Sequence, residues 1–444
     1  MGDKRGRVAA AGLRRRIDER QARVAIVGLG YVGLPLAVEF ARAGFEVTGI
    51  DVARRPVEGI RAGRSHIEDV PSEVVADLVK RKRLQAQTHY RGCGKCDAVM
   101  ICVPTPLRKT KDPDISYIVS AVEEIAKEVR PGQLIVLEST TYPGTTEEVL
   151  RPRLEAGGLE VGRDFFLAFS PERVDPGNSK FTTRNTPKVV GGTTPACTEI
   201  AAHLYRQALE QVHPVSSTQV AEMIKLLENT FRAVNIGLVN EIALMCHKLS
   251  LDVWEVIDGA ATKPFGFMRF YPGPGIGGHC IPLDPHYLSW KLKTLNYSAR
   301  FIELAAEING NMPLVVARKA AELLNGRSKS VKGSQVMILG VSYKRDTSDV
   351  RESPALDVLR LLAERGAKIS FHDPYNSEIR VDGGRLQAAT PLTAASLRRA
   401  DLVLIVTDHS CYDYDMIVKH SRLVLDTRNA TRAVRSGRSK IFRL

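Results

Sequence analysis

The chain has 444 residues, of which 44% are hydrophobic and 25% are charged, and it carries a formal net charge of +13. This length is enough for two or three domains with their own cores, and the longest apolar runs are far shorter than the ~20 residues of a membrane-spanning helix, so we expect a soluble protein. The positive residues are not interleaved with aromatic residues, which favours an anionic small substrate such as a nucleotide diphosphate over nucleic acid as the partner.

Residues 1–21 form a basic leader without the long apolar core of a secretory signal. We expect this leader to be a short basic helix or a disordered segment, solvated in either case, with a transit or membrane-surface role as the alternative. The seven cysteines are an odd number and are scattered through the chain, which indicates a reducing compartment and a cytoplasmic protein.

The first long segment, residues 22–212, predicts a domain of alternating strands and helices. Residues 23–51 give a strand, a Gly-rich turn, a helix that ends near Gly44 and a second strand. "DAVMICVPTP" and "QLIVLESTTYPG" are later buried strands. Strands that alternate with helices predict a parallel sheet with helical crossovers.

The Gly-rich turn carries the spacing of a dinucleotide-binding loop. Gly28, Gly30 and Gly33 follow a strand and open a helix, and Asp51 ends the next strand. A helix N-terminus at this place faces the phosphates with its positive dipole end. Asp51 is suited to accept hydrogen bonds from ribose hydroxyls, which favours NAD, although Arg54 and Arg55 nearby leave NADP open.

A lone C-x-x-C pair, Cys93 and Cys96, precedes the third of these strands. A zinc ribbon needs a second pair at a suitable distance, and a redox motif needs a thioredoxin-like context. We therefore interpret this pair as two ordinary thiols.

The middle of the chain predicts a long helix. Residues 218–257 contain no proline and one glycine, with apolar residues at helical spacing, and a helix of about 30 residues fits them. Such a helix often bridges domains and forms a dimer interface. Lys225 and Asn229 share one face of it and could stabilise an oxyanion, although a solvated charge is the alternative for Lys225.

Two loops outside this helix hold chemistry-bearing residues. "SPERVDPGN" places Glu172 and Arg173 after a strand-like segment, where such folds bind ligands. "GPGIGGHCIPLDP" repeats the glycine spacing at residues 273–278, but no strand precedes it and its prolines oppose a smooth helix after it.

Three interpretations of this second loop remain from its residues alone. His279, Cys280, Asp284 and His286 are zinc-binding residue types, but their spacing does not suit one ion. The loop could also be purely structural. In the third interpretation Cys280 is a nucleophile that captures an aldehyde, and Asp284 is a base or orients water.

The strand–helix grammar returns near the C-terminus. "SQVMILGVSYK" is a strand and turn, "SPALDVLRLLAERGAKISFHDP" is a helix, strand and acid, and "ADLVLIVTDHS" is another strand, with "RLVLDTRNA" as the last. The sequence predicts an α/β protein: a leader at 1–21, a Rossmann domain at 22–212, a central helical domain at 213–324 and a second Rossmann-like domain at 325–444.

Seven motifs in order resemble the UDP-glucose and GDP-mannose 6-dehydrogenase superfamily over about residues 22–430. They are "GLGYVGLPLA", "VPTP", "ESTTYPGTT", "SPERVDPGN", "VAEMIKLLENTFRAVNIGLVNE", "GPGIGGHCIPLDP" and "GVSYKRDTSDVRESPA". The resemblance implies that two NAD molecules are reduced as the C6 alcohol of a nucleotide sugar becomes a carboxylate. It also implies a C-terminal domain that holds UDP, and a homodimer built through the long helix.

The resemblance assigns roles by position. Cys280 stands where the family has its nucleophile, and Lys225, Asn229 and Asp284 match residues that handle the oxyanion, the proton and the hydrolytic water. Glu172 matches a carboxylate tied to thioester hydrolysis.

Further roles follow in the same way: Thr140 matches a residue that orients water, Arg351 one that reaches the cofactor, and Tyr343, Lys344 and Arg428 match substrate contacts. The other predicted substrate contacts are Glu172, Arg173, Val174, Lys225, Asn229, Tyr271, Gly273 and Gly277, and the other predicted NAD contacts are Gly28, Gly30, Tyr31, Val32, Gly33, Asp51, Arg55, Thr105 and Thr140.

The substrate branch is suggested by "GGHCIPLDP" and "SPERVDPGN", which look like the UDP-N-acetylhexosamine enzymes, with Leu283 where the UDP-glucose and GDP-mannose enzymes tend to have lysine. We expect UDP-N-acetylglucosamine, with the mannosamine and galactosamine epimers as alternatives. The rivals from other classes are a sensor that binds NAD and UDP-sugar without turnover, and a one-step zinc alcohol dehydrogenase. We expect no metal.

Overall fold

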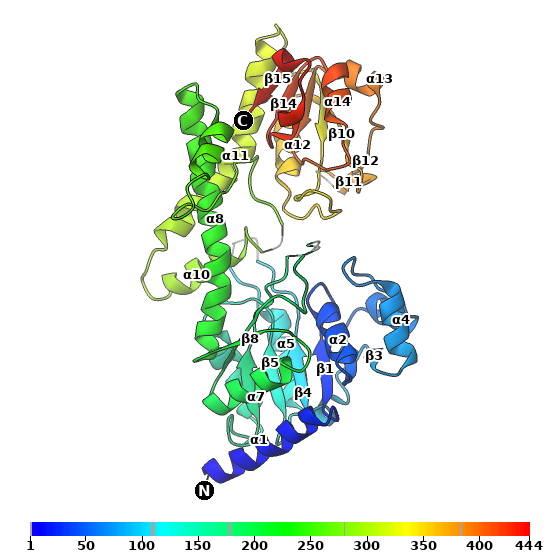
Figure 1. The fold of residues 1–444 in the computed structure, drawn as a ribbon, viewed down its shortest axis with the longest axis vertical. Coiled ribbons are helices and arrows are strands. Elements are labelled where there is room, and N and C mark those ends of the chain that lie inside the picture. Colours follow the sequence, from blue (N-terminus) through cyan, green and yellow to red (C-terminus); the bar gives the residue numbers. More distant parts are fainter. Residues whose placement is uncertain (1, 108–111, 176–177, 179, 279, 382–383) are drawn as a thin grey trace. The chain divides into compact units, whose positions relative to one another are not determined.

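The structure is a computed structural model that describes residues 2–107, 112–175, 178, 180–278, 280–381 and 384–444. The chain divides into two compact units (Figure 1). The first consists of Met1–Glu228 and His286–Tyr297, and the second of Asn229–Pro285 and Ser298–Leu444. The border between Glu228 and Asn229 lies inside one helix, α8 (Thr218–Lys248), and this 31-residue helix confirms the predicted long central helix.

The core of the first unit is a sheet whose described strands follow the order β3-β2-β1-β4-β5-β6-β7-β8. These strands are β1 (Arg23–Val27), β2 (Glu46–Ile50), β3 (Leu84–Gln87), β4 (Ala98–Ile101), β5 (Leu134–Leu137), β6 (Phe166–Phe169), β7 (Lys188–Gly192) and β8 (Val212–Val215). Every residue of β4, β5 and β6 is buried, as expected for strands covered on both faces.

The direction of the last two strands corrects the prediction of a parallel sheet. β1 to β6 run parallel, but β7 pairs antiparallel with β6, and β8 is parallel to β7. Strand direction depends on how a connection returns to the sheet, which residue periodicity does not record.

Helices cover this sheet. Those of the first unit are α1 (Gly2–Asp18), α2 (Gly33–Arg42), α3 (Arg54–Arg61), α4 (Ser72–Lys80), α5 (Ser116–Ala126), α6 (Arg151–Glu155), α7 (Pro195–Tyr205), the start of α8 and most of α10 (Asp284–Lys293), with a π-helical stretch at Thr146–Leu150.

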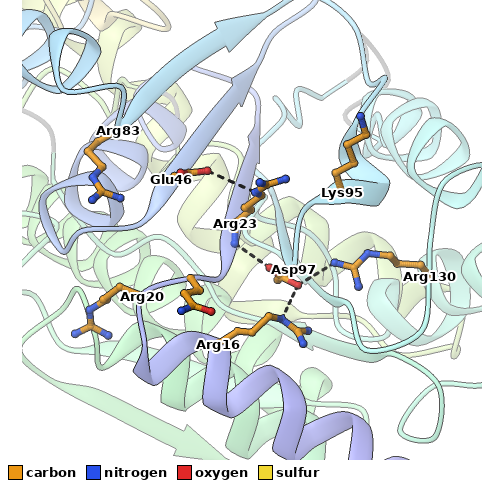
Figure 2. Close-up of a pocket in the computed structure, with 9 residues that line it drawn as sticks. Arg16, Arg20, Arg23, Glu46, Arg83, Lys95, Asp97 and Arg130 are labelled. Carbon is orange, nitrogen blue, oxygen red and sulfur yellow. Dashed lines mark hydrogen bonds and ion pairs between the residues drawn. The ribbon is translucent and has the colours of Figure 1, made fainter.

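The leader is a packed helix, so the expectation of a solvated segment is wrong. Leu13 and Ile17 of α1 are fully buried in the core of the first unit. α1 lies across the edge of the sheet at which β1 and β4 begin (Figure 1). Figure 2 shows Asp97 between the guanidinium groups of Arg16 and Arg130, at 3.0 and 2.8 Å. Through Arg16, Asp97 thus holds α1 at the start of β4, the strand that directly follows Asp97.

A cavity of about 570 Å³ beside Asp97 carries six cationic side chains and two carboxylates in its lining. Several of these cations bind backbone oxygens at the ends of helices and turns: Arg83 donates to the carbonyl of Gly44, and Arg130 to that of Gly94. The cations of this edge therefore satisfy carbonyl groups as well as the two carboxylates.

The second unit has a smaller parallel sheet in the order β10-β9-β13-β14-β15 among the described residues, as expected for a second Rossmann-like fold. Its strands are β9 (Gln335–Leu339), β10 (Lys368–His372), β13 (Leu402–Ile405), β14 (Val424–Asp426) and β15 (Ile441–Arg443), with a separate hairpin of β11 (Glu378–Arg380) and β12 (Leu386–Ala388). β15 corrects the prediction that the "RLVLDTRNA" strand is the last one.

Two layers of helices enclose this second sheet. The helices of the unit are the rest of α8, α9 (Val253–Ala260), α11 (Arg300–Asn325), α12 (Pro354–Glu364), α13 (Ala394–Arg399) and α14 (Tyr414–His420). Alternate strand residues face opposite layers: Val336 and Ile338 pack with α11 and α12, whereas Met337 and Leu339 pack with α13 and α14. Figure 1 shows α12 and α14 on opposite sides of this sheet.

Two further expectations concern the thiols and the membrane. Cys93 and Cys96 are free and buried, and burial raises the pKa of Cys93 to about 12 and that of Cys96 to about 11. Such thiols are poor nucleophiles, which agrees with their interpretation as ordinary thiols. In the described part of the chain, no helix is both long and apolar enough to cross a membrane.

Candidate active site

The dinucleotide loop has the shape that its glycines predict. β1 ends at Val27 and α2 begins at Gly33, where a Cβ atom would lie 1.8 Å from the carbonyl oxygen of Gly28. A Cβ on Gly30 would meet nothing within 4 Å, so the backbone there faces open space. Close packing at the third glycine and an open approach at the second fit a dinucleotide pyrophosphate above the N-terminus of α2.

Asp51 directly follows β2, as predicted, and one of its carboxylate oxygens accepts from the backbone N–H of Leu29 at 2.9 Å. The other accepts from Ala53. Asp51 therefore ties the Gly-rich loop to the end of the next strand, and each oxygen keeps a second lone pair with which it could accept from a ribose hydroxyl.

The remaining predicted NAD contacts of the first unit lie in the segments that directly follow β1, β2, β4 and β5. Tyr31 is half exposed, Val32 precedes α2, and Arg55 is exposed in α3. Thr105 and Thr140 lie in the loops after β4 and β5, and the hydroxyl of Ser139 joins these loops by donating to the carbonyl of Val103 at 2.7 Å.

The loop after β6 holds Glu172 in a fixed orientation. One carboxylate oxygen of Glu172 accepts from the backbone N–H groups of Arg173 and Val174, each at 2.8 Å. Arg173 forms an ion pair with Glu228 of α8 at 2.6 Å. Burial alone would raise the pKa of Glu172, but the charge of Lys188 and these two N–H groups outweigh it and lower the pKa.

Two residues of this edge are missing from the sequence prediction: Glu138, directly after β5, and Lys188, the first residue of β7. The Lys188 ammonium lies 2.5 Å from Glu138 and 3.4 Å from Glu172. A charged residue at the end of an apolar strand is common, so the sequence held no signal that joins them.

On α8, Lys225 and Asn229 are both 8% exposed, so the alternative of a solvated charge for Lys225 is wrong. In the second unit, Asn229 donates its side-chain N–H to the Asp284 carboxylate at 2.5 Å, and Asp284 is buried. The backbone N–H of Asp284 donates to the carbonyl of Cys280 at 2.8 Å, at the start of α10. Three predicted catalytic residues of the second unit therefore share one local structure.

The loop before Cys280 packs on the C-terminal sheet of the same unit. A Cβ on Gly273 would lie 2.4 Å from a guanidinium nitrogen of Arg428, and a Cβ on Gly277 would lie 2.7 Å from the Cβ of Tyr343. Partial burial of Arg428, together with the nearby charge of Arg345, lowers its pKa to about 10. Two predicted substrate contacts of the C-terminal sheet, Tyr343 and Arg428, thus lie against two others, Gly273 and Gly277, in the loop that leads to Cys280.

Other predicted residues have partners of their own. The Tyr271 hydroxyl donates to Asp258 of α9 at 2.5 Å, and the Arg351 guanidinium binds both oxygens of Asp349. The carbonyl of Lys344 accepts from Thr347. The substrate and cofactor roles assigned to Tyr271, Lys344 and Arg351 stay predictions.

For the zinc alternative, His279 lies outside the described residues. Among those described, no three His, Cys, Asp or Glu side chains are grouped so that they could hold a metal ion. The loop has no strand before it, as expected, and α10 begins only at Asp284.

Three family models match the chain in order. They are the NAD binding, central and UDP binding domains of the UDP-glucose/GDP-mannose dehydrogenase family, at residues 22–209, 219–311 and 337–433. The domain boundaries inferred from the motifs stay predictions.

Relatives match over nearly the whole chain. UDP-N-acetyl-D-glucosamine 6-dehydrogenase of Pseudomonas aeruginosa is 35% identical over 88% of this chain and 91% of its own. NDP-N-acetyl-D-galactosaminuronic acid dehydrogenase of Ralstonia nicotianae is 35% identical over 95% of this chain and 99% of its own. The UDP-D-ManNAc dehydrogenase structure from Pyrococcus horikoshii has a TM-score of 0.84 at 33% identity, covering 92% of this chain and 96% of that one. The chain therefore belongs to the UDP-glucose/GDP-mannose dehydrogenase family, as its motifs predicted, and is an NAD-dependent nucleotide-sugar dehydrogenase.

Proposed function

We propose that the protein oxidises the C6 alcohol of a UDP-N-acetylhexosamine, with UDP-N-acetylglucosamine as the first candidate, to the uronic acid through a thioester on Cys280. The observation that carries this proposal is the buried hydrogen bond between Asn229 and Asp284. Asp284 is the first residue of α10 and donates its backbone N–H to the carbonyl of Cys280. A structural loop has no need of a buried carboxylate and amide at 2.5 Å beside an accessible thiol.

NAD, when bound at the loop of Gly28, Gly30 and Gly33, supplies the hydride acceptor, and two molecules are needed because four electrons leave C6. The alcohol first loses a hydride and its hydroxyl proton and becomes an aldehyde. The Cys280 sulfur then adds to the carbonyl carbon, and the thiohemiacetal loses the second hydride and the second hydroxyl proton to give the thioester. Water adds, the C–S bond breaks, and the acid and the thiol are released.

Each side chain has its own role in these reaction steps. Lys225 and Asn229, one helical turn apart on α8, stabilise the oxyanion at C6. Asp284 takes protons, oriented by the amide of Asn229. Glu172, ionised at neutral pH, assists the attack of water on the thioester, and Thr140 orients that water.

The substrate class rests on the relatives. Those named above act on, or are named for, UDP- or NDP-linked N-acetylhexosamines with different epimers. Epimers differ by the placement of one or two polar contacts, so the shared acetamido group defines the class, and UDP-N-acetylglucosamine is the first sugar to test.

The test is NADH formation with purified protein, NAD and UDP-glucose, UDP-N-acetylglucosamine, UDP-N-acetylgalactosamine or UDP-N-acetylmannosamine. We expect two NADH per sugar with an N-acetylated substrate and none with Cys280→Ala. One NADH per sugar that is insensitive to Cys280 contradicts the thioester route. Binding of both ligands without any NADH identifies a sensor.

We also propose a homodimer through α8. Leu227, Phe231 and Leu238 are 57%, 46% and 53% exposed and follow one another at spacings of four and seven residues, which places them on one side of the helix. An exposed apolar stripe of this kind is typical of a protein interface. Light scattering should give a dimer, and the Leu227→Glu, Leu238→Glu double variant should give a monomer; a monomeric wild type refutes the proposal.

A further inference from the structure

A buried cluster of charged side chains lies behind the Glu172 loop, and the mechanism above does not use it. Lys188 and Glu138 are 4% and 1% exposed, and Tyr205 of α7 is fully buried. The Lys188 ammonium lies 2.5 Å from one carboxylate oxygen of Glu138, and Tyr205 donates its hydroxyl to the other. The same ammonium lies 3.4 Å from Glu172.

The reversed strand β7 is what assembles this cluster. Glu138 follows β5 and Glu172 follows β6, so both leave the sheet at the edge where parallel strands end. β7 runs antiparallel to β6, and its first residue, Lys188, therefore lies at that same edge. A parallel strand would have placed this lysine at the opposite edge of the sheet.

The oxygens of Glu172 are divided between two kinds of donor. One oxygen accepts from the N–H groups of Arg173 and Val174, and the other is the one that lies near Lys188. The carboxylate is thus held in one orientation by its own loop and by the lysine.

The charges in the cluster are distributed unequally. Burial raises the pKa of Glu138 even though Lys188 opposes this, whereas Lys188 and the backbone N–H groups lower the pKa of Glu172 against the effect of burial. Burial opposes the charge on Lys188 too, but the two carboxylates outweigh it and raise its pKa. A buried ammonium shared by two carboxylates favours the ionised form of at least one of them.

Other titratable groups near Glu172 in the described residues include Lys225 of α8, Arg173 with its partner Glu228, and the Cys102 thiol that follows β4. The charge of Lys225 also favours an ionised Glu172. Burial raises the pKa of Cys102 and of Tyr205 well above their usual ranges, so both stay neutral. Lys188, 2.5 Å from Glu138 and 3.4 Å from Glu172, is a cation held between two carboxylates.

We propose that Lys188 is a positioning residue that keeps the Glu172 carboxylate ionised and oriented for thioester hydrolysis, and that Glu138 anchors the lysine. This inference rests on the proposed function, since it assigns a task to Glu172. Lys188 acts through Glu172 and forms no bond to the substrate.

The experiment follows the acyl enzyme itself. Enzyme, NAD and UDP-N-acetylglucosamine are mixed and quenched at intervals, and the sugar adduct on Cys280 is measured by intact-protein mass spectrometry between pH 3 and 9. In Lys188→Met we expect the adduct to accumulate, and the pH at which its decay becomes half-maximal to rise by about 1–3 units, because removing a cation at this distance raises the pKa of a carboxylate by that much.

Three further variants separate positioning from simple packing. Lys188→Arg keeps the charge and should keep the wild-type pH profile. In Glu138→Gln, Glu172 is the one carboxylate that still pairs with Lys188, so the pH profile of this variant should stay in place or shift to lower pH. Lys127→Met removes the lysine of an exposed pair with Glu124 and is the matched control, which should behave as the wild type.

The outcomes are distinguishable. If Glu172→Gln blocks decay of the adduct while Lys188→Met decays with the wild-type pH profile, the inference is overturned and the proposed function stands. If no adduct forms in the wild type or in Glu172→Gln with any of the four UDP-sugars named above, both are overturned. If Lys188→Met does not fold, the Lys188→Met, Glu138→Gln double variant, which removes both ends of the buried ion pair, must show the same rise in pH, and its absence overturns the inference.

Discussion

Alanine at Gly278 is expected to displace the loop that carries Cys280. Gly278 has a φ of +94°, and a Cβ there would lie 2.7 Å from the ring of Tyr343. The backbone N–H of Gly278 donates to the carbonyl of Arg351 at 3.1 Å, so the loop cannot move without losing this bond. Alanine therefore meets both an unfavourable backbone angle and a ring that blocks it.

The size of the effect follows from these two terms. A residue with a side chain at such a φ costs about 1–3 kcal/mol. Carbon atoms in contact lie about 3.5–4.0 Å apart, so the Tyr343 ring or the loop must also shift by roughly 1 Å. If the backbone term alone opposes the reactive position of Cys280, two residues further on, kcat/KM for the UDP-sugar falls by about 5- to 160-fold.

The assay is steady-state NADH formation at varied UDP-N-acetylglucosamine, with NAD affinity measured separately by fluorescence. We expect kcat/KM to fall in Gly278→Ala while the NAD dissociation constant stays as in the wild type. The matched control is Gly310→Ala in α11, where a Cβ meets nothing within 4 Å and alanine should stabilise the helix by about 0.5–1 kcal/mol. Wild-type kinetics in Gly278→Ala would refute the assigned role of this loop.

Three other predictions concern stability and the buried polar pairs. Leu13→Ala should lower the free energy of unfolding by about 2–5 kcal/mol in urea titrations, since Leu13 is fully buried; no loss would return α1 to a solvated leader. Burial opposes the charge on Asp373, but the hydrogen bond from His409 and backbone N–H groups outweigh it and lower its pKa. The Asp373 carboxylate therefore stabilises the fold fully above its unfolded pKa of about 3.9, and this stabilisation is lost as the pH falls through the lowered folded pKa. Asp373→Asn should be less stable than the wild type by roughly 2–4 kcal/mol at pH 7, and the difference in stability should shrink toward low pH. Asn229→Ala removes the donor to the buried Asp284 and should cost about 1.5–3 kcal/mol of stability and slow NADH formation, whereas an unchanged melting temperature would contradict the pairing.

The elements that the sequence predicts well are those whose signals are local. Gly28, Gly30 and Gly33 open a helix after a strand because the turn, the approach and the packing are all decided within a few residues. The long helix was equally readable, because a run without proline at helical spacing has few alternatives. The family motifs then supplied roles for Cys280 and Asp284.

The elements that the sequence did not predict depend on distant partners. Nothing in residues 1–21 shows that Leu13 and Ile17 are buried, because the surface that covers them is built from other segments. β15 is three residues long and, among the described strands, pairs with β14 alone, so its own periodicity carries little signal.

The same distinction between local signals and distant partners applies to the candidate site. Lys225 and Asn229 are one turn of α8 apart, and such proximity is fixed by the helix backbone alone. Cys280 precedes α10, and the turn that joins it to Asp284 is held by a local backbone hydrogen bond. By contrast, Asn229 and Asp284 are 55 positions apart, and their hydrogen bond requires the fold of the second unit.

By itself, the amino-acid sequence determined the α/β class, the NAD loop, the long helix and the family of the protein, because local geometry and motif order carry that information. Only the tertiary structure decided that β7 is reversed and that Lys188 thereby joins Glu138 and Glu172 in one buried cluster. The direction of a strand is set by packing over the whole sheet, and a charge gains its meaning from neighbours that are remote in the chain.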